Sequence, residues 1–189
     1  MGVIKQNRMN YIYRILLTLN ATSLIIVVFL IKQEITIKSI YKHFDRLPDC
    51  ISYVFYFLAT LLLTSLSLKL SNYLSNEKIT KSSILEVENA NNIFLPSYLG
   101  YFFIALSVTN FNILIYVFII LFIFTFFSQT LYFNPLFLIF GYHFYNVSTK
   151  NKAKIFIISK SEFLQPEDME FLNLKRINNF TFIDRNKLQ

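Results

Sequence analysis

The residues most often used in catalysis and metal binding are few and scattered in this chain. The 189 residues include two histidines, His43 and His143, and a single cysteine, Cys50. Neither histidine lies at ligand spacing from a cluster of carboxylates or cysteines, and one cysteine cannot form an intramolecular disulfide or a multi-cysteine zinc site. No Gly-rich phosphate loop and no Ser or Cys nucleophile motif occurs. The sequence therefore predicts no catalytic residue, no metal, no cofactor and no enzyme activity.

Uncharged polar residues inside long apolar runs are the next candidates. Asn20 lies in the first such run, and Thr60, Thr64 and Ser67 share one helical face in the second. A polar side chain in hydrocarbon seeks a hydrogen-bond partner on another helix. These four residues predict packing between helices or self-association of copies, and the alternative is a polar ring that lines a pore.

A third group combines cations and aromatic side chains near the C-terminus. Lys175 and Arg176 precede a strand-like stretch in which Phe180 and Phe182 alternate with Thr181. Aromatic centres flanked by long cations are typical of protein interfaces. These four residues predict a partner-binding surface. The alternatives are that the two Phe side chains close a small core and that the cations are simply solvated or face lipid head groups.

Composition places these residues in a membrane protein. The chain is 54% hydrophobic and only 15% charged, with a formal charge of +7. Soluble proteins average about 25% charged residues. The basic excess is expected to report topology and contact with the lipid bilayer, and direct binding of nucleic acid is not expected. Four apolar runs predict transmembrane helices over about 15–31, 51–68, 93–108 and 113–133, the last two from a stretch without acidic or basic residues.

The expected fold class is an α-helical polytopic membrane protein with four transmembrane helices and a small α+β cytoplasmic tail. Residues 1–140 would form the transmembrane domain and residues 141–189 the tail. In the tail, Tyr142 to Val147 and Lys154 to Ser159 predict a hairpin, Pro166 with Glu167 and Asp168 a short helix, and Phe180 to Ile183 a further strand.

The connecting segments carry weaker signals. The helical spacing of Ile37, Ile40, Tyr41 and Phe44 predicts an interfacial amphipathic helix. Ser83 followed by Glu86 has the spacing of a capping box, which predicts a helix starting near Ile84. Residues 136–140 and the tyrosines Tyr132, Tyr142 and Tyr145 suit the membrane interface, although they could also be ordinary lipid-facing bulk.

Orientation follows from the basic residues. If both termini are cytoplasmic, 14 of the 18 Lys and Arg residues lie inside, all except Lys32, Lys38, Lys42 and Arg46. The positive-inside rule therefore predicts cytoplasmic N- and C-termini.

The layout of the chain and two tail segments resemble a known family. The segments are Lys154 to Lys160, KIFIISK, and Leu174 to Asp184, LKRINNFTFID. They resemble the membrane subunit of the Kiwa anti-phage defence system of bacteria. The resemblance implies a homotetrameric inner-membrane sensor and scaffold, and a cytoplasmic KwaB-like effector that acts on phage DNA. The alternatives from other classes are a small oligomeric ion channel or membrane-disrupting effector and an assembly factor for another membrane complex.

Overall fold

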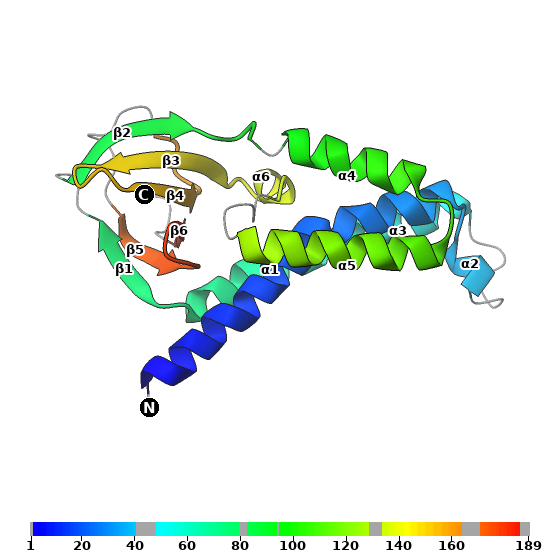
Figure 1. The fold of residues 1–189 in the computed structure, drawn as a ribbon, viewed down its shortest axis with the longest axis horizontal. Helices are drawn as coiled ribbons and strands as arrows, with labels where there is room; N and C mark the ends of the chain where they lie inside the picture. Colours follow the sequence, from blue (N-terminus) through cyan, green and yellow to red (C-terminus); the bar gives the residue numbers. More distant parts are fainter. Residues whose placement is uncertain are drawn as a thin grey trace.

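A computed structural model describes residues 2–40, 48–79, 83–93, 95–128, 134–163 and 171–185, with the side chains of residues 2–8 and 40 left aside. Helices occupy one end of the molecule and a curled β-sheet the other (Figure 1). The helices are α1 Gly2–Lys32, α2 Ile37–Ile40, α3 Asp49–Leu70, α4 Leu95–Ser107, α5 Phe111–Ser128 and α6 Leu136–Ile139, with the 3-10 turn η2 Ser71–Tyr73.

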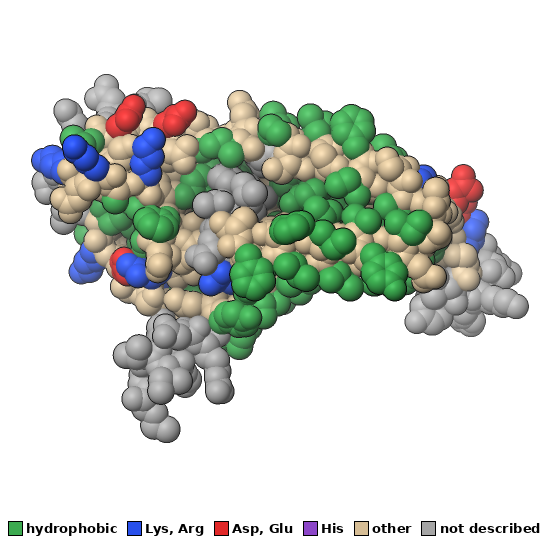
Figure 2. All heavy atoms as spheres, viewed as in Figure 1, with side chains coloured by type: hydrophobic (Ala, Val, Ile, Leu, Met, Phe, Trp, Pro, Cys, Tyr) green, Lys and Arg blue, Asp and Glu red, His purple; other side chains and the backbone are tan. Residues whose placement is uncertain are grey.

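Within the described ranges, three helices are long and apolar enough to cross a membrane, judged by length and composition. They cover Met9–Lys32, Asp49–Tyr73 and Phe111–Ser128. Figure 2 shows the apolar side chains gathered over the helices, while most of the cations and carboxylates in view lie over the sheet and at the opposite tip. These helices have the composition of segments whose outer surface faces lipid rather than water.

The expected fold class is wrong in its four transmembrane helices. The run expected to span from 93 to 108 forms α4, a helix of only 13 residues. At about 1.5 Å per residue this helix is near 20 Å long, whereas the hydrocarbon core is about 30 Å thick. The structure explains the short length, because residues 91–93 form a turn, Pro96 occupies the first helical turn, and the helix ends at Ser107.

The same expectation is wrong about the small tail. The sheet has six strands, and two of them come from the segment between α3 and α4. The strands are β1 Asn76–Ile79, β2 Ile84–Asn89, β3 His143–Thr149, β4 Lys154–Ser159, β5 Phe171–Arg176 and β6 Thr181–Asp184. Their order is β1-β5-β6-β4-β3-β2, with only the β4–β6 pair parallel.

Individual predictions in these segments had different outcomes. The hairpin of β3 and β4 and the strand near Phe180 to Ile183 are confirmed. The helix expected to start near Ile84 is wrong, because this segment is the strand β2. Residues 136–140 form the single turn α6 and its end. The predictions that involve Tyr41, Phe44, Tyr132 and residues 166–168 lie outside the described residues.

Chain connectivity forces the sheet to curl. β1 and β2 are its two edges, yet residues 80–83 alone separate them in the sequence. A flat sheet of six strands would place its edges about 24 Å apart. The five Cα–Cα steps from Ile79 to Ile84 reach about 18 Å at most. The edges must therefore approach each other, as Figure 1 shows at the left of the view.

Alternate residues of the strands point into two different cores. On β4, Ile157 and Ile158 are both fully buried, the first in an inner core and the second against the helices. The inner core contains Ile84, Tyr145, Val147, Ile155, Ile157, Phe171, Leu174 and Phe182. We call the other cluster the junction core, which contains Tyr13, Leu17, Leu68, Leu74, Ala90, Phe137, Tyr142, Phe144, Ile158, Ile177 and Ile183.

Candidate functional site

The junction core joins the apolar helices to the sheet. Leu17 of α1 and Leu68 of α3 belong to the same buried cluster as Phe144 and Ile183 of the sheet. Phe137 of α6 is fully buried in it, and its ring lies 6.3 Å from that of Phe144. Burial of many large apolar side chains in one cluster resists relative movement, because separating the parts exposes that surface. The helices and the sheet therefore form one packed unit.

A polar cluster lies beside the junction core. Arg185, just after β6, donates from Nη1 to the Tyr142 hydroxyl and from Nε to Asn72 Oδ1 at 2.8 Å. The Lys160 ammonium lies 5.1 Å from the centre of the Tyr142 ring. Burial raises the pKa of Tyr142, and the neighbouring Arg185 acts in the opposite direction. Arg185 thus ties the end of the sheet to the turn that follows α3, and it contacts Tyr142, which the sequence predicted only as a residue of the membrane interface and of the hairpin.

The residues predicted to pack helices meet between α1 and α3. Asn20 Oδ1 accepts a hydrogen bond from the Thr64 hydroxyl at 3.0 Å, and Asn20 Nδ2 donates to Ser67 Oγ at 3.4 Å. Asn134 approaches the same group, with its Nδ2 3.5 Å from Thr64 Oγ1. Thr60 is buried and donates to the Phe57 carbonyl of its own helix. These contacts lie within one chain, and self-association through this face stays a prediction.

The four residues predicted to bind a partner lie on or beside β5 and β6, but in different environments. Phe180 is 58% exposed, whereas Phe182 is 4% exposed and belongs to the inner core. Lys175 Nζ donates to the Leu74 carbonyl at 3.3 Å. Arg176 forms an ion pair with Glu77 of β1, and its guanidinium lies 5.7 Å from the Phe182 ring. Phe180 is the aromatic side chain of this set that solvent can reach.

Other residues with structural roles were not predicted. Arg14 Nη2 donates to the Phe126 carbonyl at 3.3 Å, and the Arg14 guanidinium lies 5.0 Å from the centre of the Phe126 ring. A cation at the last carbonyls of α5 also interacts favourably with the helix dipole. The only sequence signal was the position of Arg14 beside the first apolar run. The partner helix could not be identified from the sequence.

The described part of the chain places His143 at the start of β3 and Cys50 at the start of α3. No group of three His, Cys, Asp or Glu side chains there could hold a metal ion. His143 Nδ1 contacts Asn91 Nδ2 at 3.1 Å, and Asn91 Oδ1 accepts from the Phe144 amide at 2.8 Å. This arrangement fixes the turn before α4 to the start of β3. Cys50 is exposed at the start of α3, and His43 lies outside the described residues.

Comparison with known proteins identifies a family. A family model described as "Anti-phage protein KwaA" matches residues 13–183. No curated protein and no solved structure matches the chain. The matched region includes α1 from Tyr13 onward, the other described helices, the junction core and the described strands of the sheet apart from Asp184 at the end of β6. The chain therefore belongs to the KwaA family of anti-phage proteins.

Proposed function

We propose that this chain is a non-enzymatic sensor and scaffold in the bacterial inner membrane, which recruits a cytoplasmic, DNA-acting effector to its sheet. Family membership supplies the role in anti-phage defence. The proposed link between the membrane helices and the sheet rests on the junction core. Because Tyr13, Leu17 and Leu68 of the apolar helices pack in one cluster with the sheet, a disturbance of the helices would reach the sheet.

The path of the chain supports an orientation with both termini on one side. α1 and α4 run away from the sheet, and α3 and α5 return toward it (Figure 1). The N-terminal end of α1 and the sheet then lie on the same side of the helices, which is also where most of the basic residues lie in the sequence. By the positive-inside rule this side is cytoplasmic. The resemblance to Kiwa further implies a homotetramer.

The proposed docking surface is centred on Phe180. Its 58% exposure is unusual for a Phe outside the apolar helices, and an accessible aromatic side chain is a frequent anchor in interfaces. Lys175 and Arg176 lie at the end of β5, the strand paired with β6, and would steer an acidic partner. Phe182 acts indirectly, because its buried ring lies beneath the Arg176 guanidinium.

Capture of the effector by the full-length chain tests this proposal. The Phe180→Ser variant should lose most of the co-purifying effector and should keep its membrane insertion. Leu172→Ser is a matched control. Leu172 is 54% exposed on β5, so this substitution removes a similar amount of exposed apolar surface. Recruitment through this surface is refuted if both variants retain the effector equally with the unaltered chain, or if both lose it equally.

The channel alternative makes a different prediction. A pore needs polar groups along a shared path, whereas Asn20, Thr64 and Ser67 bond to one another within one chain. We therefore expect liposomes that contain the purified chain to show no ion flux. Flux in the absence of any partner would favour the channel over the scaffold.

A further inference from the structure

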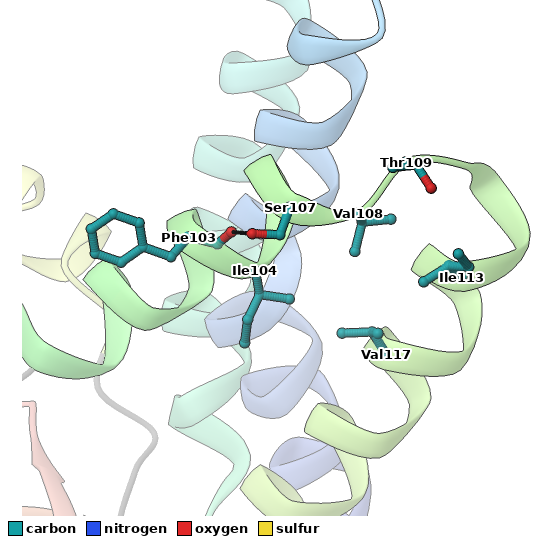
Figure 3. Close-up of a pocket in the computed structure, with 7 residues that line it drawn as sticks. All are labelled: Phe103, Ile104, Ser107, Val108, Thr109, Ile113 and Val117. Carbon is teal, nitrogen blue, oxygen red and sulfur yellow. Dashed lines mark hydrogen bonds between the residues drawn. The ribbon is translucent and has the colours of Figure 1, made fainter.

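A groove opens between α4 and α5 at the end of the molecule opposite the sheet. Its volume is about 390 Å³, and its lining includes Phe103, Ile104, Val108, Ile113 and Val117. Figure 3 shows the last four of these side chains directed toward the space between the two helices. Ser107 also lines the groove, but its hydroxyl donates to the Phe103 carbonyl at 2.8 Å. Thr109 is the other polar residue of the lining, and the remaining residues make the groove mainly apolar.

The packing of the two helices on α1 explains why the groove stays open. Ala105 and Leu114 are buried in a cluster with Ile25 and Phe29 of α1. This contact holds α4 and α5 by their α1-facing sides. Ile104 and Val117 are only partly buried against the same cluster. The space between them remains without protein atoms, and a void there would forfeit dispersion contacts unless an apolar group entered.

A cation stands at the mouth of the groove. Lys32, at the end of α1, donates from Nζ to the carbonyl of the groove residue Val108 at 2.7 Å. That bond uses one of the three N–H groups of the ammonium. Among the described residues no carboxylate pairs with Lys32, whereas Lys38 at the same end is 2.6 Å from Asp49. A lysine at the boundary of an apolar segment attracts anionic head groups.

We propose that this groove binds an acyl chain of an anionic phospholipid, whose phosphate is held by Lys32. The occupant follows from two features together, an apolar groove in the helical half of the molecule and an ammonium at its mouth. The site lies in the leaflet farther from the sheet. It requires the helices to be embedded in a bilayer, but it does not depend on recruitment of an effector.

A fluorescent reporter can test this site directly, because the chain contains no Trp. Ile113→Trp places a single fluorophore in the lining of the groove. Ile115→Trp is the matched reference, since Ile113 is 43% exposed and Ile115 41% exposed, and a separation of two residues turns Ile115 to another side of α5. Each full-length variant is reconstituted in phosphatidylcholine vesicles that contain either brominated phosphatidylglycerol or brominated phosphatidylcholine as the quencher.

We expect the reporter at position 113 to be quenched with a preference of about fivefold for phosphatidylglycerol, the size of one lysine–head group attraction. The reporter at position 115 should show little preference. Adding Lys32→Gln should abolish the preference at position 113, and Lys32→Arg should retain it. Lys38→Gln is the control for charge at the same end, and it should change nothing.

Two results would overturn the proposal. Equal quenching by both lipids at position 113 would mean that Lys32 selects no head group. Absence of quenching at position 113, with normal quenching at position 115, would mean that protein rather than lipid covers the groove.

Discussion

The buried amide of Asn20 allows a quantitative prediction about how α1 is held to α3. Replacing it by Leu removes two interhelical hydrogen bonds, from Thr64 at 3.0 Å and to Ser67 at 3.4 Å. The hydroxyls of Thr64 and Ser67 keep their bonds to carbonyls of their own helix, at 2.9 Å and 2.7 Å. Neither hydroxyl is left without an acceptor. The substitution therefore loses the two bonds and incurs no further penalty for a buried orphan.

Interhelical hydrogen bonds in membranes average about 0.6 kcal/mol each. Asn20→Leu should thus lower the free energy of unfolding by about 1 kcal/mol, which is about a fivefold change in the equilibrium constant. Unfolding of the full chain in mixed micelles by increasing SDS measures this quantity. Ser23→Ala is the control on the same helix, because the Ser23 hydroxyl donates only to the Asn20 carbonyl, at 2.8 Å.

A loss above about 3 kcal/mol would refute the reasoning, because it would require a buried polar group left unpaired. An unchanged free energy with a dissociated oligomer would refute it differently. In that case Asn20 would act between copies of the chain rather than between α1 and α3 of one chain.

Three further predictions concern the sheet and its orientation. Arg176→Glu should weaken pairing of β1 with β5 by about 1 kcal/mol, since the pair with Glu77 is partly exposed, and adding Glu77→Arg should restore most of the loss in a double-mutant cycle. The pKa of Tyr142 is raised by burial, so its contribution to the free energy of unfolding should be level below pH of about 10 and fall as pH rises through the folded pKa. Tyr142→Phe should make the measured fall smaller, and the part that remains comes from other buried tyrosines such as Tyr145, whose pKa burial also raises. The lone, exposed Cys50 should react with an impermeant maleimide added outside intact cells, and reaction only after lysis would reverse the proposed orientation.

Local sequence patterns predicted the elements that hydropathy and alternation define. The second span and the hairpin of β3 and β4 lie close to their expected ranges, and the first expected span lies within the longer helix α1. In these segments the apolar pattern and the tertiary environment agree. The expected span of 93–108 is replaced by the shorter helix α4. The absence of charged residues shows how long an apolar run is, but it does not show how much of that run forms one helix. The turn at 91–93, which sets the start of α4, depends on Asn91 and its bond to the Phe144 amide.

The prediction of a helix starting near Ile84 is wrong for another reason. Ser83 and Glu86 have capping-box spacing, which favours a helix, whereas Leu85 and Val87 alternate with Glu86 and Glu88. The period of two in these residues could have identified a strand. Its partner could not be identified in the same way, since β2 pairs with β3 more than 50 residues later. Long-range pairings of this kind also place Arg176 beside Glu77 and bury Phe182 but not Phe180.

The two strands between α3 and α4 give the proposed sensor a mechanical basis. β1 follows α3 through η2, and β2 leads into the turn before α4, so the two helices are joined to opposite edges of the sheet. A change in the distance between α3 and α4 would therefore act on both edges of a curled sheet whose edges are linked by only four residues. The closely packed inner core resists such a change, because opening the curl would uncover Tyr145, Phe171 and Phe182. Within the proposed function, the sheet would respond by shifting β5 and β6, the two strands that follow the edge strand β1 and carry Lys175, Arg176 and the adjoining Phe180.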